Sequence, residues 1–310
     1  MNILLIAGGW SSERDVSLAS GKVIGQALQN LGHVVERFDP AESLEGLMQA
    51  VKGKDFAFIA LHGSPGEDGL IQAMLDRAGC PYQGAGPAGS VLAINKAASK
   101  VLFAGAGLKT APWLLINALP DRDWRPELKF PLFIKANTGG SSLHMEQVTR
   151  PDDLYPALQR LFALGNSYLM ESAVDGAEIT CAVISERKGT QEEPIALPPI
   201  LIKPSTGSVF DYTSKYAPGG AEEICPAPIS AELTARIQEM ALKAHRVLGL
   251  TDYSRSDFIV PDDGQPVLLE TNTLPGMTSG SLLPKAAAAY GLTFEGLVAR
   301  LLELGMAKKA

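Results

Sequence analysis

Four polar side chains near the C-terminus have the types and the spacing to bind a cation and an anion together. Arg255 and Asp257 are two residues apart, and so are Glu270 and Asn272, with an Asp-Gly dipeptide between two apolar runs in the middle. That dipeptide is a strong signal for a hairpin turn, and side chains two apart on a strand share a face. A turn centred there predicts that Asp257 faces Glu270 and that Arg255 faces Asn272.

The two facing carboxylates predict a divalent cation between them. Asp257 and Glu270 would otherwise repel each other across the strand pair. With the oxygen of Asn272 they offer three hard donors and leave coordination positions open, which is how a protein holds Mg²⁺ that also binds phosphate. The alternative is a solvated face with an Arg–Asp ion pair. A Gly-rich loop at residues 274–281, directly after the hairpin, favours the metal site.

A second feature is a lysine that precedes a loop of small residues. Lys135 ends an apolar run, and the segment Ala-Asn-Thr-Gly-Gly-Ser-Ser follows it. Small residues let backbone N–H groups close on phosphate oxygens, while a lysine supplies the counter-charge. The P-loop pattern is absent, and a Gly-rich loop after a strand is usually only a turn. Lys96, at the start of an expected helix, could be a second phosphate lysine or an ordinary surface lysine.

Two further acidic residues flank an apolar pair. Glu171 at the end of one expected strand and Glu178 at the start of the next bracket Ala173 and Val174. A nucleotide needs an apolar slot for its base and a carboxylate for its ribose hydroxyls, and this segment offers both. The alternative is an exposed hairpin, which would be favoured without the other features.

Composition restricts the class of protein. The 310 residues are 46% apolar and 20% charged, with a net charge of −7. These values are ordinary for a globular protein of two or three domains, and the negative charge argues against nucleic acid and anionic membranes as partners. Three cysteines far apart in the sequence predict reduced thiols in the cytoplasm. The histidines and cysteines lack metal-ligand spacing, the N-terminus does not have the pattern of a signal peptide, and no apolar run is long enough to span a membrane.

Hydrophobic patterning predicts how the first third of the chain is built. Apolar strands alternate with helices, which predicts a parallel sheet with flanking helices. Ligands bind to such sheets at the loops after the strands, here at Gly8-Gly9 and at residues 62–69. The expected strands are residues 2–7, 34–38 and 56–61, and the expected helices are residues 14–31, 41–51 and a segment ending at residue 78.

The rest of the chain predicts two further units, which makes a multidomain α/β and α+β protein. A Gly/Ala/Pro-rich passage at residues 83–89 leads to a helix at residues 95–105, and a small α+β unit follows. The expected domains are residues 1–88, 89–175 and 176–310. The other expected elements are strands at residues 131–135, 167–171 and 178–185, helices at residues 152–164 and 231–248, a loop at residues 203–218 and a helical tail from residue 282.

In this order, the segments resemble one known family. The chain is similar to the D-alanine–D-alanine ligases of the ATP-grasp superfamily over essentially its whole length. Any one segment is moderately specific, and the ordered set is very specific. The segments are GGWSSERDVSLASG, HGSPGEDG, the Lys96 helix, KANTGGSS, FDYTSKY, YSRSDF and ETNTLPGMT.

The resemblance implies a fold and a reaction. An N-terminal parallel α/β domain that binds substrate would precede a two-part ATP-grasp fold, with ATP between the central and C-terminal units. ATP would turn the carboxylate of one D-alanine into a carboxyl phosphate, and the amine of a second D-alanine would attack it, as a step of peptidoglycan precursor synthesis. The family further implies two Mg²⁺ ions, which Mn²⁺ can replace, a homodimer and a cytoplasmic location.

The resemblance also assigns the nucleotide and metal contacts, residue by residue. Phosphate would be bound by Lys96, Lys135 and Ser142. Adenine would contact the positions of Glu171 and Val174, and ribose the carboxylate of Glu178. The Mg²⁺ ligands would be Asp257, Glu270 and Asn272.

The remaining assignments concern the two amino-acid substrates. Arg255 and the backbone N–H of Gly276 match the groups that stabilise the tetrahedral oxyanion, a role that needs preorganised donors. Glu13 matches the acid that orients the first ammonium, and His62 is placed in the same substrate site. The second carboxylate would be held by Ser281, the backbone of Leu282 and Lys215, and a mobile loop would be tied over the closed site by Ser141 and Tyr216.

Several residues depart from the family pattern. Asn95 stands where aspartate is usual, Ala136 where proline is usual and Ser172 where lysine is common. Leu143-His144 replaces a small Val-Gly pair, which puts bulk and a titratable group beside the phosphate loop. None of these changes removes a catalytic group, so nucleotide affinity is the property that they concern.

Two other functions are open. One is an ATP-grasp ligase for another D-amino acid or a D-hydroxy acid. Tyr216 argues against a hydroxy acid, because tyrosine at this loop position goes with an amine acceptor and phenylalanine with depsipeptide formation. The other is a nucleotide-binding regulatory protein without turnover, and the presence of Asp257, Glu270, Asn272 and Arg255 argues against it.

Overall fold

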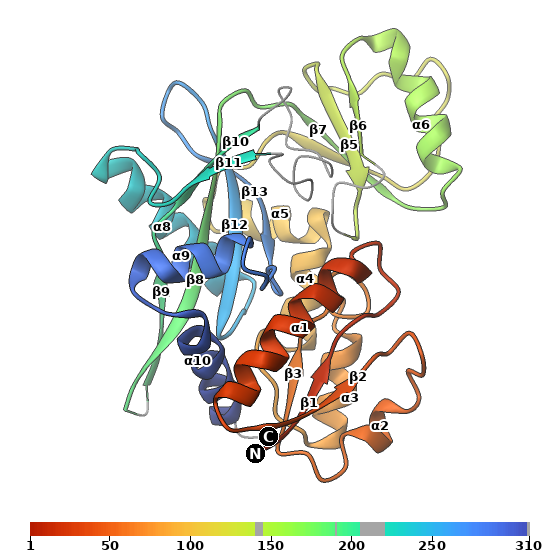
Figure 1. Cartoon of the computed structure of the whole chain (residues 1–310). Helices are drawn as coiled ribbons and strands as arrows, with labels where there is room; N and C mark the ends of the chain where they lie inside the picture. Colours follow the sequence, from red (N-terminus) through yellow and green to blue (C-terminus); the bar gives the residue numbers. More distant parts are fainter. Residues whose placement is uncertain (140–144, 190, 205–220, 309–310) are drawn as a thin grey trace.

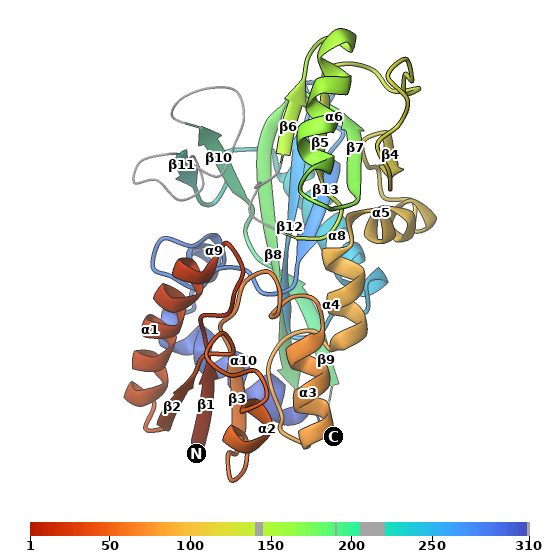
Figure 2. The same cartoon turned by 90° about the vertical axis from the view of Figure 1, so that its right-hand side faces the viewer.

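The computed structural model describes residues 1–139, 145–189, 191–204 and 221–308. Strands in this part of the chain form three sheets. The N-terminal sheet and the central sheet lie at opposite ends of the molecule, and the larger C-terminal sheet runs along both (Figures 1 and 2). The first unit has a parallel sheet, and the two that follow combine antiparallel sheets with helices. This arrangement confirms the predicted fold class. Among the residues described, no helix combines the length and the apolar character that crossing a membrane requires.

The N-terminal sheet is parallel, with its first strand in the middle. Strand β1 (Asn2–Ile6) pairs with β2 (Val34–Phe38) on one side and with β3 (Phe56–Ile59) on the other. Its four residues after Asn2 are buried, as expected of a strand covered on both faces. The helices of this unit are α1 (Arg14–Asn30), α2 (Leu47–Ala50) and α3 (Leu70–Ala78).

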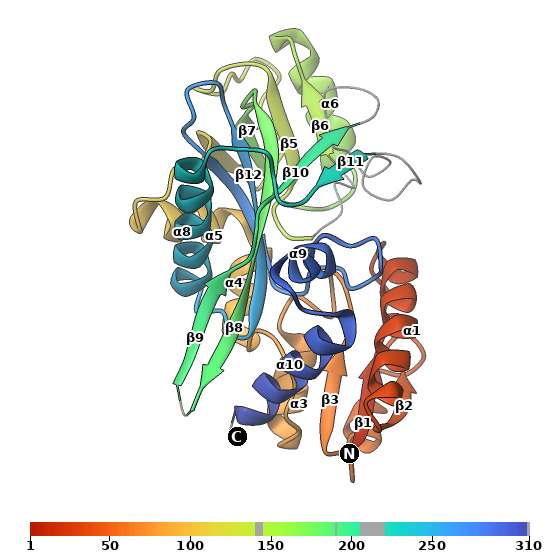
Figure 3. The same cartoon turned by 60° about the vertical axis from the view of Figure 1, so that its left-hand side comes forward.

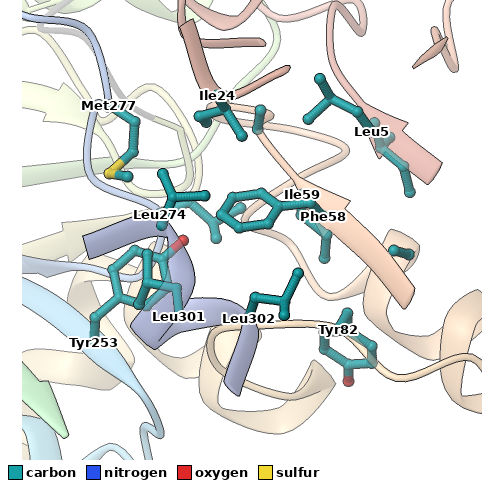
Figure 4. Packing of buried hydrophobic residues seen from close by; sticks show 14 of the residues in the cluster. Leu5, Ile24, Phe58, Ile59, Tyr82, Tyr253, Leu274, Met277, Leu301 and Leu302 are labelled. Carbon is teal, nitrogen blue, oxygen red and sulfur yellow. The ribbon is translucent and has the colours of Figure 1, made fainter. Parts of the chain in front are cut away.

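The last helix of the chain completes the core of this first unit. Helix α10 (Phe294–Ala307) lies beside β3, close to the chain's N-terminus (Figure 3). Leu301 belongs to the same buried cluster as Phe58, as the close view of the packing shows (Figure 4). A Cβ atom on Gly305 would lie 2.7 Å from the ring of Phe56, so this close approach requires glycine. The two ends of the chain therefore share one hydrophobic core.

The central unit is a small antiparallel sheet covered by a helix. The strand order is β4-β7-β5-β6, and helix α6 lies across the sheet (Figure 2). Two consecutive helices lead from the N-terminal unit to this sheet. The elements are α4 (Pro87–Ile94), α5 (Lys96–Gly105), β4 (Trp113–Ile116), β5 (Leu132–Ala136), β6 (Met145–Val148), the 3₁₀ turn η1 (Pro151–Asp153), α6 (Leu154–Phe162) and β7 (Tyr168–Ser172).

The C-terminal sheet is built around one long strand. Strand β8 (Ala177–Lys188) pairs with β10, with β12 and, at its far end, with β9. Helix α8 packs against this sheet, and its face contributes Ile237 and Ala241 to a second buried cluster. The other elements are β9 (Gln191–Ala196), β10 (Ile200–Pro204), β11 (Ala221–Ile224), α8 (Ala231–Val247), β12 (Tyr253–Val260), β13 (Val267–Asn272) and α9 (Leu282–Tyr290).

Several elements differ from the sequence prediction. The helix expected at residues 41–51 is only Leu47–Ala50, because Asp39 binds the amide of Ala41 and holds the chain before it in turns. Helix α4 was not predicted, because a Gly/Ala/Pro-rich segment argues against a helix, although proline fits the first helical position. Strands β4 and β6 were also missed, since each has only four residues.

Candidate active site

The hairpin formed by β12 and β13 has the predicted pairing at the four polar residues. Asp257 lies opposite Glu270, and Arg255 lies opposite Asn272. The turn is not a simple two-residue connection, because Phe258 pairs with Leu268 and the register shifts between Asp257 and Phe258. This bulge restores the predicted register at the polar residues, and it places their side chains on one face.

Asp257 is the centre of a hydrogen-bond network on that face. Its two carboxylate oxygens accept from Nε and Nη2 of Arg255 at 2.9 and 2.8 Å. The hydroxyl of Thr180, on the neighbouring strand β8, donates to Oδ1 at 2.6 Å, and Nδ2 of Asn272 donates to Oδ2 at 3.1 Å. The Arg–Asp ion pair named as the alternative to a metal site is therefore present.

Glu270 also has a cation nearby. The Nζ atom of Lys96 is 3.7 Å from its Oε2 atom, and its side chain is 26% exposed. Each of the two facing carboxylates thus has its own positive partner, which reduces the repulsion between them. No group of three or more His, Cys, Asp or Glu side chains suited to a metal occurs among the described residues. A divalent ion at Asp257, Glu270 and Asn272 would therefore depend on further oxygen ligands from a substrate.

Lys96 is positioned by contacts between α5 and the loop after β5. Asn95 caps the helix, and its Oδ1 atom accepts from the amide of Ala98 at 3.1 Å. The side chain of Asn137 accepts from the amide of Ala97 and donates to the cap residue. The Nζ atom of Lys96 itself donates to the carbonyl of Gly139 at 2.7 Å. Asparagine at position 95 therefore keeps the capping function that aspartate would have there.

Lys135 and Glu171 are in direct contact. Their Nζ and Oε1 atoms are 2.5 Å apart, and Oε2 of Glu171 is 2.9 Å from Nζ of Lys100. Burial acts to raise the pKa of Glu171, but the two lysines outweigh it and hold that pKa below its ordinary value. Burial also acts to lower the pKa of Lys135, yet the charges of Glu171 and Glu270 keep it above its ordinary value. Both groups are therefore charged at neutral pH.

Val174 and Glu178 lie where the chain passes from the central sheet into the C-terminal sheet. Val174 is half-buried in the connection from β7 to β8, and Glu178 is half-buried at the start of β8, opposite Ile202 of β10. The apolar pair and its flanking acids thus lie where the central and C-terminal units meet. Of the predicted site residues, Ser141, Ser142, Lys215 and Tyr216 lie outside the described part of the chain.

Glu13 and His62 come from two loops of the N-terminal sheet that contact each other. The hydroxyl of Ser11 donates to the carbonyl of His62 at 2.6 Å and accepts from the amide of Glu13 at 3.1 Å. The negative charge of Glu13 acts on His62. Both residues therefore belong to one edge of the sheet, as ligand-binding loops of a parallel sheet should.

His62 and Glu67 hold the backbone of Leu274 from both sides. The Nδ1 atom of His62 is 3.0 Å from the carbonyl of Leu274, and Glu67 accepts from the Leu274 amide at 3.1 Å. Burial lowers the pKa of His62, so the ring is neutral at pH 7. The Nδ1–H tautomer then donates to Leu274, while Nε2 accepts from the hydroxyl of Ser20 at 3.2 Å. Burial, with the charge of Glu13 added, raises the pKa of Glu67 to about 7.

Gly276, Ser281 and Leu282 form one compact turn at the start of α9. Ser281 Oγ accepts from the amide of Thr278 at 3.0 Å. A Cβ atom on Gly276 would lie 2.8 Å from that Oγ atom, so a side chain at this position would disturb the turn. Leu282 is the first residue of α9, and the N–H groups at a helix start attract anions.

Three residues of the site were not singled out from the sequence. Lys100 lies one helical turn after Lys96, and that spacing on one helix face was the available signal. Glu67 lies within the HGSPGEDG segment, but its contact with Leu274 joins residues far apart in the chain. Thr180 has no local signal, because its role depends on pairing between β8 and β12.

Comparisons with known proteins show which family the chain resembles. The family model described as "D-ala D-ala ligase C-terminus" matches residues 102–303. The chain is 59% identical to a D-alanine–D-alanine ligase of Nitratidesulfovibrio vulgaris (strain DP4) over 306 residues, which cover 99% of this chain and 98% of the relative.

Solved structures extend the likeness to the fold. A D-alanine–D-alanine ligase from Bacillus anthracis complexed with ATP is 31% identical, with a TM-score of 0.84 and coverage of 98% of this chain and 97% of that one. The VanG D-Ala:D-Ser ligase from Enterococcus faecalis is 28% identical, with a TM-score of 0.84 and coverage of 98% and 99%. The chain belongs to the D-alanine–D-alanine ligase family.

Proposed function

We propose that this site joins two D-alanines into D-alanyl-D-alanine at the expense of ATP, releasing ADP and phosphate, in the synthesis of peptidoglycan precursors. The observation that carries the proposal is the contact between Lys96 and Glu270, 3.7 Å apart. It brings a lysine suited to phosphate next to the acid and amide oxygens of the hairpin. Phosphoryl transfer needs this combination of positive charge and oxygen ligands for a metal.

The nucleotide binds between the central and C-terminal sheets. Lys96, Lys135 and Ser142 bind its phosphates, and Glu178 binds the ribose hydroxyls. Adenine lies against Val174 and the position of Glu171. Because two lysines hold the Glu171 side chain, the contact with adenine at that position is made by the backbone.

Asp257, Glu270 and Asn272 fit Mg²⁺, because their donors are hard oxygens and Asn272 uses its nitrogen for the bond to Asp257. We expect two ions, with Mn²⁺ able to replace them. When bound, the ions neutralise charge on the phosphate oxygens. Arg255 lies on the same face, in contact with Asp257.

In the first step, a carboxylate oxygen of one D-alanine attacks the γ-phosphorus of ATP, and ADP leaves. Glu13 orients the ammonium of this D-alanine. His62 acts indirectly, by holding the carbonyl of Leu274. In the second step, the neutral amine of the other D-alanine attacks the carbonyl carbon, and phosphate leaves. Arg255 and the N–H of Gly276 stabilise the oxyanion that forms.

The second D-alanine is held by its carboxylate. Ser281, the backbone N–H of Leu282 and Lys215 bind it at the start of α9, where the helix end favours a negative charge. Ser141 and Tyr216, which lie outside the described residues, are expected to tie a loop over the site in the closed enzyme. Exclusion of water is required here, because an acyl phosphate hydrolyses readily.

The second candidate is the use of another acceptor, and the likeness to a D-Ala:D-Ser ligase is the observation that favours it. Phosphate release from ATP, measured with D-alanine only, with D-alanine plus D-serine, with D-alanine plus D-lactate, and without amino acid, separates the candidates. We expect D-alanine only to support full turnover and D-alanyl-D-alanine to be the main product. Predominance of a mixed product would overturn the acceptor assignment, and the lack of stimulation by D-alanine would overturn the whole proposal.

We further propose three domains at residues 1–88, 89–175 and 176–310, a homodimer and a cytoplasmic location. The three sheets support the division, with the addition that α10 packs into the N-terminal core. The three cysteines, all free, suit a reducing compartment. Sedimentation equilibrium at micromolar concentration tests the dimer: a mass of twice the 32.8 kDa of one chain would support it, and a mass of 32.8 kDa would contradict it.

A further inference from the structure

Lys100 is the most completely buried charged side chain near the proposed nucleotide site. Its side chain has 0% exposure, whereas Lys135 retains 15%. It lies on α5, its partner Glu171 lies on β7, and Lys135 lies on β5. Three elements of the central unit thus converge on one carboxylate, which has one ammonium on each of its oxygens.

The two lysines differ in what they can reach. A nucleotide phosphate can meet Lys135 through its exposed part, but Lys100 has no surface through which to meet a ligand. Burial lowers the pKa of Lys100, against the attraction of Glu171. A buried ammonium is retained at such a cost only where a carboxylate pairs with it.

Binding of nucleotide to Lys135 would change the balance of charge around Glu171. If Lys135 turns from Glu171 to a phosphate oxygen, a carboxylate with 5% exposure loses one of its two partners. With no other cation it would be a buried, unpaired charge, and it would compete with phosphate for Lys135. The contact with Lys100 removes that competition.

We propose that Lys100 is a positioning residue for nucleotide binding: it keeps the Glu171 carboxylate neutralised, so that Lys135 is free to bind phosphate. This inference rests on the proposed role of Lys135 in ATP binding. Lys100 touches neither nucleotide nor reacting atoms. It acts on the nucleotide only through Glu171 and Lys135.

The test measures binding of ADP by calorimetric titration without D-alanine. Lys100→Met keeps the length and the apolar stem of the side chain but removes its charge. We expect the Kd for ADP to rise at least tenfold, while the KM for D-alanine changes less than twofold. Lys243→Met, at an exposed position of α8, is the matched control and should leave the Kd within twofold. An unchanged Kd in folded Lys100→Met protein would overturn the proposal.

A double variant separates positioning from a structural role. Lys100→Met with Glu171→Gln removes the carboxylate together with its buried partner, so Glu171 no longer competes with phosphate for Lys135. We expect the double variant to bind ADP more tightly than Lys100→Met does, although it carries one more substitution. It should regain at least half of the change in log Kd that Lys100→Met causes. If Lys100→Met does not fold, the double variant decides the question, because a tenfold or larger loss in it would overturn the proposal.

The wild-type protein distinguishes this inference from the proposed function. If wild-type protein binds ADP and forms D-alanyl-D-alanine, but Lys100→Met binds ADP equally well, only the role of Lys100 is wrong. If wild-type protein binds no ADP, the proposed function fails first, and the role of Lys100 fails with it.

Discussion

The backbone amide of Leu274 donates a hydrogen bond of 3.1 Å to the carboxylate of Glu67, a residue of the N-terminal unit. The carbonyl of the same residue is held by His62 at 3.0 Å. The N–H and the C=O groups of Leu274 are therefore both held by side chains of the N-terminal unit. Because Gly276 follows two residues later, the N-terminal unit fixes the backbone that carries the proposed oxyanion donor.

Glu67 should make stability depend on pH. Its pKa of about 7 lies above the ordinary value of 4.5, so between these values the folded protein keeps a proton that the unfolded chain has lost. Stability from this group therefore falls as pH rises from about 4.5 to 7, by at most about 1.4 kcal/mol per pH unit. Glu67→Gln resembles the protonated acid and should remove this slope. Urea unfolding at pH 5, 6 and 7 measures it.

The matched control for that experiment is Glu239→Gln, an exposed position of α8. It should keep the wild-type slope. A Glu67→Gln protein with the same pH dependence as wild type would contradict the assignment.

Glu270→Gln should abolish ligation and leave the fold intact. The amide keeps the size of the side chain but loses the charge that faces Asp257 and attracts Lys96. We expect turnover to fall by roughly a hundredfold or more, as for the loss of one preorganised charge at a transition state. Binding of Mn²⁺ in the presence of ADP, followed by electron paramagnetic resonance, should weaken in parallel. Turnover like that of wild type would remove Glu270 from the metal site.

Arg255 should act mainly on the transition state, since the oxyanion exists only there. Arg255→Ala should lower kcat about a hundredfold or more. Arg255→Lys should recover little of this loss, because lysine cannot replace both hydrogen bonds to Asp257. Steady-state kinetics with varied D-alanine checks both variants. A higher KM with unchanged kcat would instead indicate a role in ground-state binding.

Lys308 should stabilise the junction of the N-terminal and C-terminal units. Its Nζ atom is 2.6 Å from Oδ2 of Asp252, which is fully buried and also accepts from the amide of Gly84 at 2.7 Å. Burial raises the pKa of Asp252 to about 6, and Lys308 opposes that rise. Lys308→Met should therefore cost about 1–3 kcal/mol above pH 6 and less below it, where Asp252 can take up a proton.

Thermal unfolding at pH 5 and pH 8 measures this difference. Lys243→Met again serves as the exposed control, with no change in midpoint at either pH. A loss for Lys308→Met that is equal at both pH values would show that the contact acts through packing and not through charge.

Features that depend on local periodicity could be predicted from the sequence. The facing of Asp257 and Glu270 followed from the alternation of a strand and from an Asp-Gly turn. The three parallel strands followed from their apolar runs. The pairing of Lys100 with Glu171 could not be predicted in this way, because it joins a helix to a strand across a fold whose packing no local pattern describes.

Helix α4 illustrates the second kind of failure. Its segment begins among glycine and proline residues, which favour a loop by local propensity. Tertiary packing overrides that preference, since a Cβ atom on Gly89 would lie 3.1 Å from the side chain of Leu250. The position needs a small residue for contact with the C-terminal unit, and composition does not reveal such a contact.

The bulge after Asp257 affects which changes in length the hairpin can accept. Because Phe258 pairs with Leu268 while Asp257 pairs with Glu270, Leu269 is the one extra residue of β13. Its deletion would place Glu270 directly after Leu268 and so leave it opposite Asp257, because loss of a bulge residue restores a regular ladder. Added residues at the exposed positions 262–263 would also leave the paired strands in place. The two facing acids can therefore be kept through the loss of one residue at the bulge and through added residues at the tip of the hairpin.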